Sequence, residues 1–138
     1  PIHLYVESRR LPEILPVLLD GGHKVVIPHY GTFDRTLGPA RDPGFKVLLE
    51  SARTERVYVV MSGAYRVGPE RARQATPMLL DAFGPQRLMW ASDWPHTDTG
   101  LDRATTYPKT LKWFEEWVPD EAVRRTILVD TPTRLYGF

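Results

Sequence analysis

Short apolar runs alternate with segments of helical spacing along this sequence, and this alternation limits the possible folds most strongly. The runs are too short for helices, and the β-branched ones are typical of strands covered on both faces. The predicted strands are Ile2–Glu7, Val25–Ile27, Val57–Met61 and Leu88–Ala91. The predicted helices cover about 11–20, 44–53, 71–83, 107–118 and 119–128. Such alternation predicts an α/β fold of parallel βα units joined by right-handed crossovers.

Two local features add structural predictions. Pro16 lies inside the first helical pattern, which predicts a kink or a late helix start at that point. After Leu128 the sequence VDTPTRLYGF predicts a short tail, whose Leu135, Tyr136 and Phe138 are expected to dock on the body of the domain.

The composition is that of one ordinary globular domain, residues 1–138. The chain carries a net charge of +1 and has no cysteine. This charge argues against nucleic-acid binding and against a polybasic membrane surface, and no apolar run approaches the roughly 20 residues that a membrane span requires. We therefore expect a cytoplasmic protein in which any metal would need histidine and carboxylate ligands. Because the sequence enters a strand directly at Pro1, we also expect that an amino-terminal part is absent.

A polar side chain lies near the end of each predicted strand. Tyr5 belongs to the first strand, His29 follows the second, Arg66 the third and Asp93 the fourth. Carboxyl ends of parallel strands meet at one rim, where active sites collect. Asp93 could orient or deprotonate a water molecule, and Arg66 could bind a substrate carboxylate through two donors. His29 could polarise a carbonyl or bind a metal, and Tyr5 could donate to a developing oxyanion.

Each of these residues also has a structural interpretation. Asp93 could cap the turn that follows it, and His29 could simply form hydrogen bonds in its loop. Arg66 could be a solvated charge, and Tyr5 a core aromatic residue with its hydroxyl at the surface. His96, three residues after Asp93, could support that loop, act as a ligand or be exposed. Other loop arginines are interpreted as solvated charges: Arg35, Arg41 and Arg103.

Five segments in a fixed order carry a resemblance to a known family. They are VVIPHYG, DPGFKVLLE, VMSGAYRV, LLDAFGPQRLMWASDWPH and the closing RLYGF. Together they resemble the amidohydrolase-related family of the amidohydrolase 2 type, and most closely its 2-pyrone-4,6-dicarboxylate lactonase branch. The resemblance spans essentially the whole chain. It implies a (β/α)₈ TIM barrel in which this chain supplies strands five to eight with their helices.

The resemblance also implies roles for single residues. Asp93 would be the general base that activates water, and His29 would assist at the carbonyl or carboxylate of the substrate. Arg66 and Tyr5 would bind the acidic substrate. His96 lies in the DWPH element and is grouped with these substrate-binding residues, where we expect it to play a supporting role.

The sequence departs from the family pattern at two places. Pro28 stands where the family commonly has Asp before the strand-six histidine. The HxH pair of strand one has no counterpart, because His3-Leu4-Tyr5 does not match it. We therefore expect that strands one to four are missing, which would leave an apolar sheet face and two strand edges uncovered. Such a face predicts a homo-oligomer or pairing with the missing amino-terminal half.

Three functional hypotheses remain open at this point. The first is a metal-independent, cofactor-free hydrolase that opens a lactone of a carboxylated small molecule with water. The second is a metal-dependent amidohydrolase or decarboxylase, in which His29 and Asp93 bind a divalent ion such as zinc alongside histidines of the missing part. The third is an inactive half-barrel fragment or an assembly module, since catalysis needs a complete, positioned set of groups.

Overall fold

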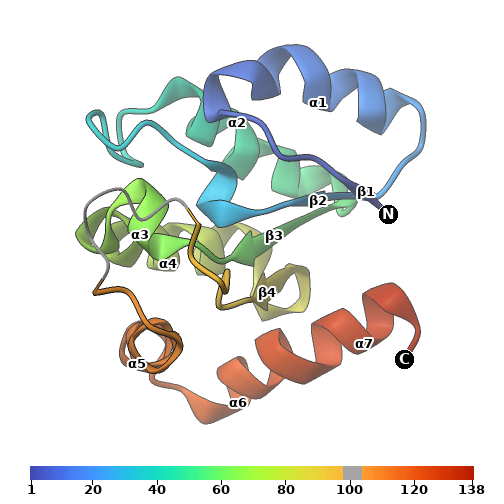
Figure 1. Cartoon of the computed structure of the whole chain (residues 1–138). Helices are drawn as coiled ribbons and strands as arrows, with labels where there is room; N and C mark the ends of the chain where they lie inside the picture. Colours follow the sequence, from blue (N-terminus) through green and yellow to red (C-terminus); the bar gives the residue numbers. More distant parts are fainter. Residues whose placement is uncertain (98–103) are drawn as a thin grey trace.

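The centre of the structure, a computed structural model that describes residues 1–97 and 104–138, is a parallel sheet. Its four strands lie in chain order: β1 (Ile2–His3), β2 (Val25–Ile27), β3 (Val57–Met61) and β4 (Leu88–Trp90). Every neighbouring pair is parallel, with Val25 opposite Val57 and Val59 opposite Leu88. The predicted parallel α/β arrangement is confirmed. All four strands therefore end at the same edge of the sheet (Figure 1).

Helices connect the strands and follow the last one. They are α1 (Leu11–Asp20), α2 (Pro43–Ser51), α3 (Ala64–Val67), α4 (Pro69–Phe83), α5 (Tyr107–Trp117), α6 (Glu121–Arg125) and α7 (Thr131–Tyr136). Prolines lie in the first turn of several of these helices, where no backbone donor is lost. Asp42 and Asp120 cap the starts of α2 and α6 by accepting backbone N–H bonds. In the described part of the chain, no helix has both the length and the apolar character needed to cross a bilayer.

The main core lies between one face of the sheet and the helices α1, α2, α4 and α5. Alternate strand residues point into it, because side chains along a strand alternate between the two faces. The strand contribution is Val25, Ile27, Val57, Val59, Met61 and Leu88. The helices contribute Leu11, Leu15, Phe45, Leu48, Leu79 and Phe114, all nearly or fully buried. This packing fixes the sheet against the helices and so holds the strand ends in place.

The opposite face of the sheet is covered at its centre by the carboxyl-terminal helix. Val26, Tyr58 and Met89 form a second buried cluster on that face, and Leu135 of α7 packs against it. The ring of Tyr136 stacks on His3, and its hydroxyl lies 3.0 Å from His3 Nε2. The expectation of a wholly uncovered face is therefore wrong at these positions. Docking through Leu135 and Tyr136 is confirmed, whereas Phe138 is exposed.

Several boundaries differ from the sequence predictions. β1 ends at His3 rather than Glu7, because the chain leaves the sheet edge and Ser8 binds Thr32 and Asp42 instead. Pro16 does not delay α1, which already begins at Leu11. The helical path also continues past Leu128 through a π-helical turn, Thr126–Asp130, into α7. Pro132 lies in the first turn of α7, so it does not stop the chain from remaining helical.

Candidate active site

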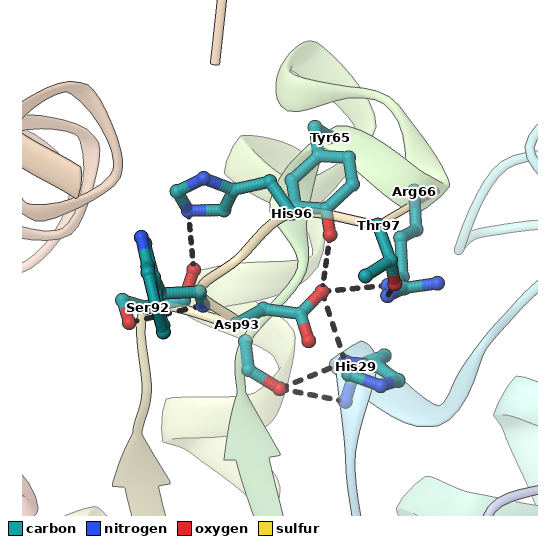
Figure 2. A network of polar contacts seen from close by, with 9 residues as sticks. His29, Tyr65, Arg66, Ser92, Asp93, His96 and Thr97 are labelled. Atoms are coloured by element: carbon teal, nitrogen blue, oxygen red, sulfur yellow. Dashed lines mark hydrogen bonds and ion pairs between the residues drawn. The ribbon is translucent and has the colours of Figure 1, made fainter. Parts of the chain in front are cut away.

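The predicted convergence of residues at the strand ends is confirmed for three of them. His29 lies just after β2, Arg66 in α3 just after β3, and Asp93 just after β4. Their side chains meet in one cluster at the carboxyl edge of the sheet, each about 13–15% exposed (Figure 2). Residues dozens of positions apart therefore form one site, as parallel strand order requires.

The carboxylate of Asp93 is the centre of this cluster. Its Oδ2 atom accepts hydrogen bonds from the Tyr65 hydroxyl and from Nε of Arg66, both at 2.6 Å. The same oxygen lies 3.9 Å from Nδ1 of His29. Within the described residues, Oδ1 accepts no hydrogen bond. One oxygen is thus held in place by charge-assisted bonds, while the other can still accept a proton or a water molecule.

Burial and the Asp93 charge set the protonation of the groups around that carboxylate. Burial raises the pKa of Tyr65 far above its ordinary value, and the hydrogen bond to Asp93 raises it further, so the phenol remains a donor. Burial by itself lowers the pKa of Arg66, but the hydrogen bond and charge of Asp93 outweigh it and raise that pKa. The guanidinium therefore stays charged at every physiological pH.

His29 is held mainly by Ser62. The Ser62 hydroxyl lies 2.9 Å from Nδ1 of the ring and accepts the backbone N–H of His29 at 3.2 Å. Burial lowers the pKa of His29, and the positive charge of Arg66 reinforces this effect, whereas the negative charge of Asp93 and a contact with the Ser62 backbone oppose it. The net direction is downward, which favours the neutral imidazole at pH 7.

Tyr5 and His96 occupy different parts of the site. Tyr5 lies beyond the end of β1 and is 59% exposed, with its ring edge-on to His29 at a centroid distance of 5.0 Å. His96 is buried, packs edge-on against Tyr65 and holds its own loop through a 3.1 Å bond between Nε2 and the carbonyl oxygen of Ser92. Contact of either residue with substrate stays a prediction. His96 lies beside Tyr65, a position that suits the supporting role expected of it (Figure 2).

A glycine makes this close approach possible. Gly63 has a φ of +58°, and a Cβ there would lie 2.8 Å from His29 Nδ1 and 2.9 Å from Asp93 Oδ2. Only a residue without a side chain fits between these groups. The backbone of His29 and Asp93 is also left-handed, with φ of 54° and 60°. Non-glycine residues with such angles are uncommon and often mark functional sites.

Sequence reasoning missed Tyr65, Ser62 and Gly63 as site residues. All three lie in the Ser62-Gly63-Ala64-Tyr65-Arg66 segment, of which only Arg66 was selected. Their position directly after the β3 strand was the available signal. The Asp98 to Arg103 loop, with the predicted solvated charge Arg103, lies outside the described residues. Arg35 and Arg41 are exposed, as expected.

The structure also contains a cavity of about 390 Å³. The loops that follow β1 and β2 line it with residues that include Glu7, Arg9, Thr32, Arg35 and Asp42. Asp93, His29 and Arg66 do not line this cavity. The cavity therefore does not contain the Asp93 carboxylate.

The donor groups present do not by themselves fit a metal ion. Catalytic zinc usually has three protein ligands, and no three His, Asp or Glu side chains in residues 1–97 and 104–138 are grouped to hold one. His29 Nδ1 is occupied by Ser62, and Asp93 Oδ2 is occupied by Tyr65 and the cationic Arg66. A metal at this place would need ligands beyond His29 and Asp93.

Comparison of the whole chain with known proteins identifies its family. A family model described as amidohydrolase matches residues 1–138. The chain belongs to the amidohydrolase family. This amidohydrolase chain is 32% identical over 141 residues to 4-sulfomuconolactone hydrolase of Rhizobium radiobacter, a match that covers 99% of this chain and 47% of that protein.

Solved structures agree with this family and its fold. The structure of a probable 2-pyrone-4,6-dicarboxylic acid hydrolase from Acinetobacter baumannii, with citric acid bound, matches at a TM-score of 0.88 and 32% identity. An amidohydrolase from Burkholderia multivorans with bound zinc matches at 0.80 and 27%. Each match covers 99% of this chain and 52% of the other. The chain spans about half the length of the curated relatives it matches, and its four parallel βα units correspond to half of a TIM-barrel-type fold.

Proposed function

We propose that the protein carrying this chain hydrolyses a lactone or related cyclic ester of a carboxylated small molecule. The similar proteins named above are a sulfomuconolactone hydrolase and a probable hydrolase of a pyrone dicarboxylic acid, and both of these compounds are acid-bearing cyclic esters. The single observation that carries the proposal is the Asp93 carboxylate, with Oδ2 held by Tyr65 and Arg66 and Oδ1 open among the described residues. A carboxylate fixed in this way suits a general base for water.

In the proposed reaction Asp93 removes a proton from water while the water oxygen bonds to the lactone carbonyl carbon. His29, beside Asp93, assists at the carbonyl oxygen as negative charge develops there. Collapse of the tetrahedral intermediate breaks the ring C–O bond, and the leaving oxygen takes the proton from Asp93. The product is an open-chain hydroxy acid that releases the proton of its new carboxyl group to solvent. Asp93 is then again a carboxylate.

Charged and polar groups at the rim would bind the acid group of the substrate. Arg66 brings a permanent positive charge to the cluster and is oriented by Asp93 and by Thr97, whose hydroxyl lies 3.4 Å from Nη2. Tyr5 adds an exposed phenol next to His29. In this proposal His96 supports Tyr65 and the Asp93 loop.

The substitution Asp93→Asn tests the assignment in the protein that carries this chain. We expect turnover of a carboxylated lactone to fall by about 1,000-fold or more, because Asn accepts no proton from water. Circular dichroism should show an unchanged fold. The matched control is Asp120→Asn, since Asp120 only caps α6 and Asn caps a helix about as well. Retention of activity in Asp93→Asn would overturn the proposal.

A metal-dependent hydrolase is the second candidate, favoured by the zinc in the Burkholderia multivorans structure. It would need donors beyond His29 and Asp93 and a change in the pairing of Asp93 with Arg66. Metal analysis of the purified protein separates the candidates. Stoichiometric zinc whose removal abolishes turnover supports the second, and full activity after exhaustive chelation supports the first.

A further inference from the structure

The Ser62 side chain binds both the backbone and the ring of His29. Ser62 is only 4% exposed, and in the described part of the chain its hydroxyl makes two hydrogen bonds, both with His29. The backbone N–H of His29 donates to Oγ at 3.2 Å, and Nδ1 of the ring lies 2.9 Å from the same oxygen. The direction of the second bond decides where the neutral imidazole carries its proton.

The protons available to Ser62 determine the direction of the bond between its Oγ and His29 Nδ1. A hydroxyl has one proton to donate and two lone pairs that accept. One lone pair accepts from the backbone of His29, and the proton of this buried hydroxyl needs an acceptor of its own. Within the described residues, Nδ1 is the group paired with Oγ that can accept it. If Nδ1 were the donor instead, the hydroxyl proton would be buried without a partner.

Asp93 does not compete for a proton on Nδ1. The distance from Nδ1 to Asp93 Oδ2 is 3.9 Å, which is too long for a hydrogen bond. That oxygen already accepts from Tyr65 and Arg66 at 2.6 Å. The lowered pKa of His29 agrees with a neutral ring.

We propose that Ser62 holds neutral His29 with its proton on Nε2, so that His29 donates a hydrogen bond from Nε2 to the carbonyl oxygen of the bound cyclic ester. Ser62 is then a positioning residue, and Asp93 is the only base of the cluster. The part that concerns the substrate carbonyl rests on the proposed hydrolysis, whereas the position of the proton does not. Donors placed where an oxyanion develops are among the strongest contributions to catalysis.

The neighbours of Ser62 support this arrangement. A side chain at Gly63 would meet Nδ1 at 2.8 Å, so the backbone passes directly beside the ring. Tyr5 packs edge-on against the ring and limits its rotation. In this tautomer Nε2 is a hydrogen-bond donor, and it could bind a metal only after its proton moves or is lost.

The tautomer can be measured without any substrate. The protein is labelled with ¹⁵N-histidine, and the His29 signals are assigned by their loss in His29→Gln. We expect a protonated nitrogen at Nε2 and an unprotonated one at Nδ1 near neutral pH. The reverse assignment in the wild-type protein would overturn the proposal, whatever the protein hydrolyses.

The Ser62→Ala variant tests the role of the hydroxyl. We expect the preference for protonated Nε2 to be lost and kcat to fall about 10-fold or more, with KM changed less than twofold. Ser62→Thr keeps a hydroxyl and should restore the tautomer. The matched control is Ser51→Ala, another buried serine, whose hydroxyl donates to the Leu48 carbonyl far from the site. Ser51→Ala should leave both the His29 tautomer and kcat unchanged.

Two outcomes overturn the inference, and they differ from failure of the proposed function. A His29 tautomer that is unchanged in Ser62→Ala means that Ser62 does not set it. An altered tautomer with unchanged kcat on an active lactone means that His29 is not the donor. By contrast, retained hydrolysis in Asp93→Asn overturns the proposed function while the wild-type spectrum still reports on Ser62.

Discussion

The two ends of the sheet are built differently. Left-handed backbone at non-glycine residues is concentrated at the carboxyl end, where the candidate site lies: His29, Tyr30, Thr32, Asp93 and His96. The amino end, in the described part of the chain, has one such residue, Glu55 before β3. There α7 is bound to the segment before β4 by ordinary hydrogen bonds. The Thr131 hydroxyl donates to the Pro85 carbonyl, and Arg134 donates to the Gln86 carbonyl.

This difference shows where the fold contains backbone conformations that lower its stability. Sparsely populated backbone conformations cost about 1–3 kcal/mol each and persist only where the surroundings determine them. At the carboxyl end they bring His29 and Asp93 close together, where Ser62 holds His29 and the Tyr65 and Arg66 side chains hold Asp93. None of the candidate site residues in the described part of the chain lies at the amino end, where the bonds of α7 are ordinary ones. Matched substitutions at the two ends can test this division.

The largest difference is expected between two glycines. In Gly63→Ala the new Cβ meets His29 and Asp93 below 3.0 Å at a φ of +58°. We expect turnover to fall about 100-fold, because small displacements of reacting groups are costly, and stability to fall by about 2–4 kcal/mol. Kinetics and urea unfolding measure the two effects.

Gly137→Ala, directly after α7, is the control. Its φ is +79°, but a Cβ there meets nothing within 4 Å. Only backbone strain of about 1 kcal/mol is expected, with turnover unchanged. Equal losses of turnover in both variants would contradict a functional difference between the two ends.

A smaller difference is expected between two tyrosine hydroxyls. Tyr65→Phe removes the 2.6 Å bond to Asp93 Oδ2 and should lower kcat about 10-fold, because the carboxylate is less well oriented. Tyr136→Phe removes the 3.0 Å contact with His3 and should leave kcat unchanged. Steady-state kinetics of the pair checks this, and a Tyr65→Phe enzyme of normal kcat would show that the phenol does not orient the base.

The smallest effect on turnover is expected from Leu135→Ala. Leu135 packs on the second face against Val26, Tyr58 and Met89 and is partly buried. The truncation should lower stability by about 1–2 kcal/mol, less than for a fully buried leucine. Both kcat and KM of the folded enzyme should remain unchanged. A raised KM would mean that packing of α7 on the second face also shapes the site.

Much of the fold and of the site could be predicted from local patterns. The runs Val25–Ile27 and Val57–Met61 are apolar throughout, as parallel strands covered on both faces must be. Parallel order then requires that His29, Arg66 and Asp93 share one edge, and the structure brings them together. This inference needs only strand direction, which the helical segments between the strands determine.

Tertiary contacts decided the rest. No periodicity in the sequence predicts that Arg66 pairs with Asp93, that the Tyr65 hydroxyl binds the same oxygen, or that Ser62 holds the His29 ring. Each of these bonds joins residues 27 to 33 positions apart. Likewise, the last helix covers the second face through Leu135 because residues more than a hundred positions apart, such as His3 and Tyr136, come into contact. Sequence spacing thus determined the strands and the edge where they end, whereas the partners of each polar atom depended on distances that exist only in the folded chain.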